Sequence, residues 1–308
     1  MQLDIKTNDK LDQLRAILNT HIIGNSFQID LSLTSLIAGG HILIQGNPGT
    51  GKTSFAKLLS DMIRCNYKRI QFTPDLLPAD ILGFSMFNQK NQDFEFIEGP
   101  VFTNILLADE INRTTPRIQS ALLEAMNEKQ VTIDGKTRQL SDLFFVIATQ
   151  NHFHTTGTYP LPESQLDRFL ISFEMNLANA ETNAEILRLH LSQENTPEAV
   201  ISEADVLSWQ ESCRNMTVSD TLVDYLGRLG EACNNDKSFR TSISSRALLA
   251  LMRASQAWAF LNEQTAVYPE DVKLLMPFVF AHRLQLKAGN KNFTVHDRLD
   301  EILKQTEI

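Results

Sequence analysis

Apolar and polar positions divide the first half of the chain into two alternating kinds of segment. Four short runs have the pattern of strands, and helical or loop segments separate them. These runs cover residues 42–44, 69–72, 104–108 and 143–149. Strands that alternate with helices are typical of a parallel sheet with helices on its faces. The first half is therefore predicted to be α/β.

The helical spacing of apolar residues predicts helices around this sheet. One helix begins near Leu11, before the first strand, and a later one presents Ile118, Leu122 and Met126 on one face. The segment that follows, residues 130–140, has the pattern of a hairpin with a turn at its Asp-Gly pair. We therefore expect a hairpin inserted before the last of the four strands.

Past Asn176 the strand signals end and helical patterns take over. The apolar positions that carry these patterns are Leu222, Tyr225, Leu226 and Leu229, then Leu248, Leu251 and Met252, then Val272, Leu275, Met276 and Val279. Pro269, which two acidic residues follow, is typical of a first helical turn, where a missing N–H is harmless and negative charge suits the helix dipole. We predict an α/β domain over residues 1–176 and a smaller all-helical domain over residues 177–308.

The composition narrows the class of protein. A hydrophobic fraction of 43% and a charged fraction of 21% are typical of a globular protein, and no run of eighteen apolar residues could span a bilayer. The first ten residues lack the basic and apolar regions of a signal peptide, so we expect a cytoplasmic protein. Cys65, Cys213 and Cys233 form no C-x-x-C pair, which argues against a disulfide framework and against a zinc knot.

The net charge of −9 makes nucleic acid a weaker expectation as a partner. Binding to nucleic acid without sequence preference depends on Lys and Arg side chains that neutralise phosphates. An acidic ring protein with a basic pore would still be compatible with this total.

A glycine-rich segment provides the first candidate chemistry. Residues Gly46 to Thr53 read GNPGTGKT, which matches G-x-x-x-x-G-K-[ST] and lies between a predicted strand and a predicted helix. Backbone N–H groups of such a loop converge on a phosphate, and the helix directs the positive end of its dipole there. We expect Lys52 to reach the β- and γ-phosphates and the Thr53 hydroxyl to hold Mg²⁺.

Two carboxylates end the third apolar run. Asp109 and Glu110 have the pattern of a Walker B element, in which Asp109 would bind Mg²⁺ together with Thr53. Glu110 would then orient and polarise the water that attacks the γ-phosphate. A kinase is a weaker interpretation, because the sequence has no signature of a second substrate pocket.

The next strand ends beside a neutral amide. Asn151 would lie near the two carboxylates at the carboxyl edge of the sheet, where it could hold the attacking water or sense the γ-phosphate. His152 and His154 follow it, and without a nearby set of Cys or carboxylate ligands they are interpreted as loop residues and not as a metal site.

Taken together, these segments resemble the AAA+ ATPases and, within them, the MoxR family. The tracts that carry the resemblance are GNPGTGKT (46–53), DLLPADILGFS (75–85), FEFIEGPVFTNILLADEINR (94–113), QSALLEAMNEKQVTIDG (119–135), ATQN (148–151) and GTYPLPESQLDRF (157–169). Further on, SSRALLAL (244–251) and YPEDVKLLMPFVFAHRL (268–284) look like the lid of that family. The resemblance implies an AAA+ core with a hairpin insertion, followed by a helical lid.

The family also implies roles for residues that spacing alone does not assign. Arg168 matches the arginine finger, which reaches the γ-phosphate held by a neighbouring subunit. Arg246 matches the sensor 2 arginine of the lid, and Arg113 matches an arginine near the subunit boundary whose interface role we leave open. ATP is the implied nucleotide. The residues expected to hold it are Ile23 and Gly24 at the base, and Gly46, Asn47, Pro48, Gly49, Thr50, Gly51, Lys52, Thr53 and Ser54 at the phosphates.

The resemblance implies a chaperone-like ATPase that remodels or matures protein complexes. It implies a ring of subunits, with six as the expected number, a partner with a von Willebrand factor A fold, and a protein client. The ATPase subunit of a metal chelatase is an alternative, because it shares the hairpin insertion and that kind of partner. A nucleic-acid motor is a weaker alternative, which Lys129, Lys136 and Arg138 at the hairpin would permit and the acidic total opposes.

Overall fold

A five-stranded sheet forms the centre of the α/β region. The computed structural model describes residues 5–46, 49–150, 157–175, 177–191, 198–287 and 293–308. The sheet order is β2-β5-β8-β1-β9, and every neighbouring pair is parallel. The strands are β1 (Ile42–Gln45), β2 (Tyr67–Gln71), β5 (Ile105–Asp109), β8 (Phe145–Gln150) and β9 (Ile171–Glu174). Because all five run the same way, their carboxyl ends meet at one edge, where α/β proteins bind ligands.

Alternating side chains on the strands bury two separate apolar layers. Ile42 and Ile44 of β1 pack into one core, whereas Leu43 between them packs into the other. The first core contains α1 (Ile5–His21), α2 (Ser26–Ile37) and α3 (Lys52–Ile63). The second contains α4 (Pro78–Leu82) and α5 (Pro116–Glu128). Helices on both faces of a parallel sheet confirm the predicted fold class.

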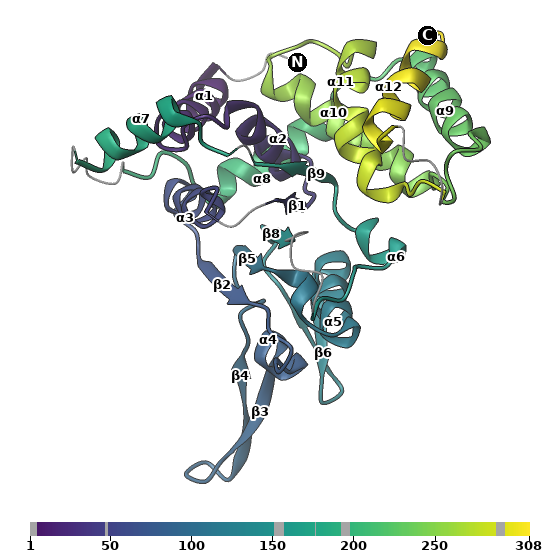
Figure 1. Cartoon of the computed structure of the whole chain (residues 1–308). Helices are drawn as coiled ribbons and strands as arrows, with labels where there is room; N and C mark the ends of the chain where they lie inside the picture. The colour runs from purple at the N-terminus through teal and green to yellow at the C-terminus, as the bar shows by residue number, and fades with distance from the viewer. Residues whose placement is uncertain (1–4, 47–48, 151–156, 176, 192–197, 288–292) are drawn as a thin grey trace.

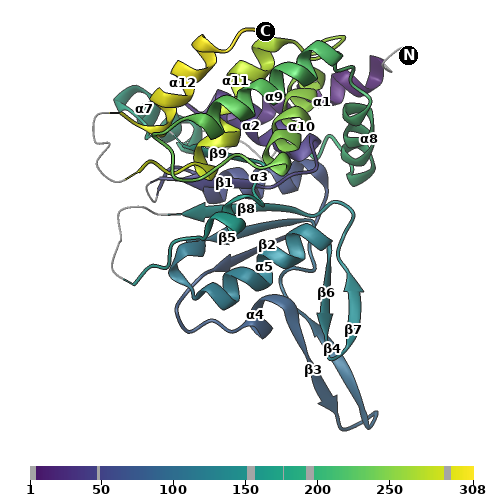
Figure 2. The same cartoon turned by 90° about the vertical axis from the view of Figure 1, so that its right-hand side faces the viewer.

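Two hairpins extend from the body at the same end (Figure 2). The hairpin of β6 (Gln130–Ile133) and β7 (Lys136–Gln139) was predicted, and Asp134 and Gly135 in its turn have the positive φ angles of 53° and 72°. The sequence did not predict the longer hairpin of β3 (Gly83–Asn88) and β4 (Asp93–Glu98).

Glycine allows the base of that longer hairpin to close. A Cβ atom on Gly83 would lie 2.3 Å from the carbonyl oxygen of Ile97, and one on Gly99 would lie 2.2 Å from that of Ile81. The backbone therefore approaches too closely at both positions for any side chain.

Helices alone follow β9 in the described part of the chain. They are α7 (Ala180–Leu191), α8 (Glu203–Arg214), α9 (Asp220–Asn235), α10 (Ser245–Leu261), α11 (Pro269–Phe280) and α12 (Val295–Gln305), with the short 3-10 helix η2 (Ala281–Arg283) after α11. Pro269 does begin a helix, as predicted. Side-chain oxygens of Ser202, Ser219, Ser244 and Thr294 accept N-terminal backbone N–H bonds at α8, α9, α10 and α12.

The helical region packs against the N-terminal helices as well as beside the sheet (Figure 1). Helix α2 contacts both α8 and α10, and the Gln210 side chain donates to the Leu36 carbonyl at 2.8 Å. The first apolar core therefore continues from the sheet into the helical region.

Among the described residues, no helix is both long and apolar enough to cross a membrane. Burial raises the pKa of each cysteine thiol, at residues 65, 213 and 233, to about 12.

Candidate functional site

The glycine-rich loop forms an open cradle between β1 and α3. Gly46, Gly49 and Gly51 have positive φ angles of 115°, 83° and 84°, which non-glycine residues rarely adopt. A Cβ atom built at any of these glycines meets nothing within 4 Å. The backbone of the loop is therefore accessible to a ligand, as phosphate binding requires. Asn47 and Pro48 lie outside the described residues.

A cavity of about 430 Å³ lies over this loop at the carboxyl edge of the sheet. It is lined by Gly46, Gly49, Gly51, Lys52, Thr53, Ser54, Arg69, Gln71, Asp109, Glu110, Thr149 and Gln150. The structure thus brings the predicted phosphate loop and the predicted acid pair together in one place. We refer to it below as the phosphate-loop cavity.

Lys52 is positioned between the loop and the acid pair. Its ammonium group donates to the Gly46 carbonyl oxygen at 3.1 Å. Partial burial lowers the pKa of Lys52, and the carboxylates of Asp109 and Glu110 oppose that shift. The ammonium group is therefore held near the end of β5, where a phosphate would also meet it.

Thr149 of β8 connects the two acidic residues. Its hydroxyl donates to one carboxylate oxygen of Asp109 at 2.6 Å and accepts from the backbone N–H of Glu110 at 2.8 Å. Glu110 has a left-handed backbone conformation with φ 56° and ψ 49°, which is uncommon for a residue with a side chain. Backbone strain of this kind concentrates at functional sites, and the Thr149 hydroxyl helps to hold it here.

Two arginines occupy the outer oxygens of the acid pair. Arg69 of β2 lies 2.7 Å from the second carboxylate oxygen of Asp109, and Arg113 lies 2.9 Å from one oxygen of Glu110. The sequence interpretation missed both Arg69 and Thr149, because they belong to strands whose ends meet Asp109 only in the folded sheet. It left the role of Arg113 open, and the structure places it on Glu110.

The cavity has the chemistry to hold a nucleotide phosphate with Mg²⁺. Thr53 and Asp109 contribute a hydroxyl and a carboxylate, which are hard oxygen ligands of the kind Mg²⁺ takes. The described residues contain no group of three or more His, Cys, Asp or Glu side chains that could hold a metal on their own. A site with few protein ligands suits Mg²⁺, which retains waters and binds the phosphates of its substrate.

A second cavity, of about 490 Å³, lies at the opposite edge of the sheet. It is bordered by residues that precede β1 and β9, including Gly40 and Leu170, and by the carboxyl end of α5. Arg168 and Arg246 both line this cavity and do not line the phosphate-loop cavity. We refer to it below as the arginine cavity.

The arginine cavity has an excess of positive charge. Its charged lining residues are Lys129, Arg168, Arg246, Arg253 and Arg283, together with Glu128 and Asp167. Arg168 is half-buried and donates to the Leu123 carbonyl oxygen at 2.7 Å, whereas its buried Nε has no hydrogen-bond partner. Arginines grouped in this way suit a polyanion such as a phosphate chain.

The remaining predicted residues lie away from both cavities or outside the described chain. Ile23 and Gly24 precede α2 and line neither cavity, and a Cβ on Gly24 would lie 3.0 Å from the Thr182 side chain of α7. Asn151, like His152 and His154, lies outside the described residues.

A glycine cradle, a lysine at a helix start and a strand that ends in two acids, on this fold, define an ATPase of the AAA+ class. The family described as "ATPase family associated with various cellular activities (AAA)" matches residues 41–171, and the AAA lid domain matches residues 231–302.

Relatives of known sequence and structure identify the family within this class. Chaperone MoxR1 of Mycobacterium tuberculosis is 38% identical over 86% of this chain and 73% of its own length. The uncharacterized protein YeaC of Bacillus subtilis is 44% identical over 87% of this chain and 85% of its own length. A crystal structure of a protein assigned as an ATPase, from Cytophaga hutchinsonii, superimposes with a TM-score of 0.91 and 35% identity over 99% of this chain and 96% of that one. The chain belongs to the MoxR family of AAA+ ATPases.

Proposed function

We propose that this ATPase hydrolyses ATP with Mg²⁺ in the phosphate-loop cavity. Lys52 and the loop N–H groups bind the phosphates, and Thr53 and Asp109 hold the metal ion, which neutralises charge on the phosphates. Glu110 polarises the attacking water, and Asn151, the next residue after β8 in the sequence, assists it. The support for these roles is the convergence of Lys52, Thr53, Asp109 and Glu110 on one open cradle.

We also propose that the working site is shared between neighbouring subunits of a ring, with six as the expected number. The observation that carries this proposal is the separation of the two cavities, since β1 alone has four residues and a strand rises about 3.3 Å per residue, so roughly 13 Å of sheet lies between them. Arg168 and Arg246 face away from their own phosphate loop and towards the nucleotide of the next subunit. An arginine supplied to a γ-phosphate in this way increases the rate by about 10³ to 10⁵.

A mixing experiment tests the shared site. Arg168→Ala subunits lack the finger but retain a complete phosphate-loop cavity, whereas Glu110→Gln subunits lack the water-polarising group but retain the finger. Each homogeneous ring should be nearly inactive, and mixed rings should recover ATP hydrolysis wherever a Glu110→Gln subunit supplies Arg168 to its neighbour. Absence of recovery at every ratio would refute a finger that acts between subunits.

Simple variants test the cavity itself. Lys52→Ala should weaken nucleotide binding, because it removes a charge that faces the phosphates. Glu110→Gln should preserve binding and stop turnover. Equal rates of ATP hydrolysis for Glu110→Gln and the unaltered protein would exclude the proposed role of that carboxylate. The same measurements with GTP in place of ATP would establish which nucleotide base the protein prefers.

We propose that the energy of hydrolysis remodels or matures a protein complex, through movement of the helical region 177–308 against the α/β region 1–176. The support is the exposed surface of the longer hairpin, where Phe84, Met86, Phe87 and Phe94 have exposed fractions between 47% and 67%. Exposed apolar patches of this kind mark protein interaction sites. The same hairpin has three carboxylates and one lysine, which opposes contact with nucleic acid.

The proposed partners are a protein with a von Willebrand factor A fold and a protein client, in the cytoplasm. The name of the relative MoxR1 describes a chaperone, which supports this function over a chelatase subunit. A hydrolysis-deficient Glu110→Gln ring should retain both partners long enough for their identification by mass spectrometry. Recovery of a metal-inserting enzyme would favour the chelatase alternative, and strong stimulation of ATP hydrolysis by DNA at low salt would favour a nucleic-acid motor.

A further inference from the structure

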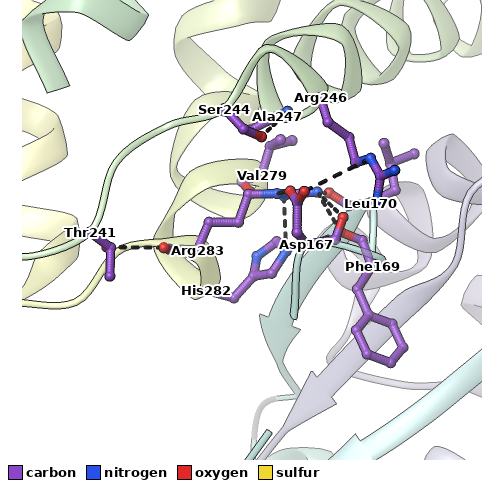
Figure 3. A network of polar contacts seen from close by, with 10 residues as sticks. All are labelled: Asp167, Phe169, Leu170, Thr241, Ser244, Arg246, Ala247, Val279, His282 and Arg283. Carbon is purple, nitrogen blue, oxygen red and sulfur yellow. Dashed lines mark hydrogen bonds and ion pairs between the residues drawn. The ribbon is translucent and has the colours of Figure 1, made fainter. Parts of the chain in front are cut away.

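A buried arginine of the helical region makes several contacts with the segment that carries Arg168. Residues 167–170 connect α6 (Glu163–Leu166) to β9, and the carbonyl groups of Asp167, Phe169 and Leu170 face Arg283 of η2 (Figure 3). The Arg283 side chain is only 5% exposed. Its Nη2 donates to the Phe169 carbonyl oxygen at 2.7 Å and, at 3.4 Å, to that of Asp167, and its Nη1 donates to the Leu170 carbonyl oxygen at 3.4 Å.

The same arginine pairs with the residue directly before the finger. The Nε of Arg283 lies 2.8 Å from one carboxylate oxygen of Asp167. Val279 of α11 supplies a further carbonyl acceptor to Arg283, and His282 lies against the same guanidinium group. A buried guanidinium group is stable only when its charge is paired and its N–H groups are bonded, so this arrangement strongly disfavours movement of residue 167 away from residue 283.

Asp167 also faces the second arginine of the cavity. The Nε of Arg246 lies 4.0 Å from the other carboxylate oxygen of Asp167, and the Arg246 side chain is 61% exposed. The Asp167 carboxylate therefore lies between two arginines, with one oxygen beside the buried Arg283 and the other beside the exposed Arg246. The exposed contact is long and weak, so an incoming phosphate could replace it, whereas the buried pair would persist.

The finger has few other restraints in the described part of the chain. The Arg168 guanidinium makes one hydrogen bond, to Leu123, and its backbone N–H bonds to Gln165 within the same short turn. The segment around it is held from two sides. Arg283 and His282 of the helical region bond to the Phe169 carbonyl oxygen, and the Leu170 N–H bonds to the His41 carbonyl oxygen before the segment continues into β9.

We propose that Asp167 and Arg283 form a positioning clamp, which fixes the finger to the helical region and holds Arg246 beside it until the nucleotide of the next subunit binds Arg246. The clamp acts through Arg168 and Arg246 and touches no substrate. This inference rests on the proposed sharing of the site between subunits.

The test variant is Asp167→Asn, which retains the size of the side chain and removes its charge. Misplacement of a catalytic group by about 1 Å can cost on the order of 100-fold in rate, so we expect homogeneous Asp167→Asn rings to lose between about 10- and 100-fold in ATP hydrolysis. Nucleotide binding to the phosphate-loop cavity of the same subunit should not change, because Asp167 lies at the opposite edge of the sheet.

The decisive measurement is the activity of Asp167→Asn subunits mixed with Glu110→Gln subunits. Mixed rings should recover activity, because a Glu110→Gln neighbour supplies a correctly positioned finger to an intact phosphate-loop cavity. The matched control is Asp236→Asn, which removes another carboxylate of the helical region that pairs with an arginine, Arg298, away from the finger. If Asp236→Asn rings lose ATP hydrolysis, mixing them with Glu110→Gln subunits should not restore it.

The mixture of Arg168→Ala with Glu110→Gln serves as the reference. Recovery in the reference without recovery for Asp167→Asn would overturn the clamp and leave the shared site intact. No recovery in either mixture would overturn both proposals. Equal recovery for Asp167→Asn and Asp236→Asn would also overturn the clamp. If Asp167→Asn rings do not assemble, Arg283→Lys, which retains the charge but offers fewer donors to the carbonyl groups, is subject to the same criteria.

Discussion

Arg69 competes with Mg²⁺ for the proposed metal ligand Asp109, so we expect its removal to increase the affinity for Mg²⁺. Its guanidinium group lies 2.7 Å from one carboxylate oxygen of Asp109, while the Thr149 hydroxyl occupies the other oxygen at 2.6 Å. A metal ion that binds Asp109 must therefore displace Arg69 or share the carboxylate with it. Both alternatives oppose metal binding, because the guanidinium group is positive and Mg²⁺ is too.

The exposure of the pair sets the size of the effect. The side chains of Arg69 and Asp109 are 46% and 15% exposed, so the ion pair is partly solvated and is worth about 0.5–1 kcal/mol. Replacement of Arg69 by Met removes this competition and should increase the apparent affinity for Mg²⁺ by about 2- to 5-fold. The matched control is Lys57→Met, which removes one positive charge from an exposed position of α3 outside the cavity lining.

The assay is the Mg²⁺ dependence of nucleotide binding. A fluorescent ADP analogue reports binding without turnover, and the Mg²⁺ concentration at half-maximal signal is compared among the unaltered protein, Arg69→Met and Lys57→Met. An unchanged or higher half-maximal concentration for Arg69→Met than for Lys57→Met would refute the competition. Binding measured in the presence of a chelator separates this effect from any direct contact between Arg69 and the phosphates.

Three further changes test other parts of the structure. Gly40→Ala would place a Cβ atom 2.5 Å from that of Leu170, beside the finger segment, so urea unfolding should show a free energy of unfolding lower by about 1–3 kcal/mol. Gly227→Ala, whose Cβ would meet nothing within 4 Å, should show no such decrease. Burial lowers the pKa of His41 from 6.5 to about 4, so the unfolded chain binds a proton at a higher pH than the folded protein does. The free energy of unfolding should therefore be highest above pH 6.5 and fall by about 3 kcal/mol as the pH is lowered to 4. The free energy of unfolding of His41→Gln should depend less on pH between 4 and 6.5. Phe94→Ser, at the 67% exposed tip of the hairpin, should preserve basal ATP hydrolysis and reduce client-dependent stimulation in a coupled assay.

The parts of the site that are contiguous in the chain could be predicted from the sequence. A phosphate loop has a fixed spacing because its backbone must wrap one phosphate, and Asp109 and Glu110 follow an apolar strand directly. Arg69 and Thr149 carry no such local signal. They reach Asp109 because β2 and β8 flank β5 in the sheet, and strand order depends on packing across the whole domain.

The fold was predictable to a similar extent. Strand-like runs identified four strands of the sheet, but β9 has only four residues, two of them polar (Ser172 and Glu174), and gave too short a pattern. The hairpin at Asp134-Gly135 has a turn pair with strong local preferences, whereas the longer hairpin turns at Gln89 to Gln92 without glycine, so that it lacked a turn signal. The exposed aromatic residues of that hairpin also follow no burial pattern, since they do not face a core.

The two cavities are linked by one short and rigid element. Strand β1 ends at Gln45, just before Gly46 of the phosphate-loop cavity, and begins just after Gly40 and His41 of the arginine cavity. At that beginning the Leu170 N–H donates to the His41 carbonyl oxygen at 2.8 Å, and the His41 ring accepts from the Val146 N–H at 3.0 Å. Close-packed, fully buried strands transmit displacement with little compliance. Under the proposed shared site, a shift of the phosphate loop on nucleotide binding would be transmitted through β1 to the segment that carries Arg168 of the same subunit, and so to the nucleotide of the next subunit. In a ring, this connection would make the state of each site depend on that of its neighbour, with β1 as the physical link.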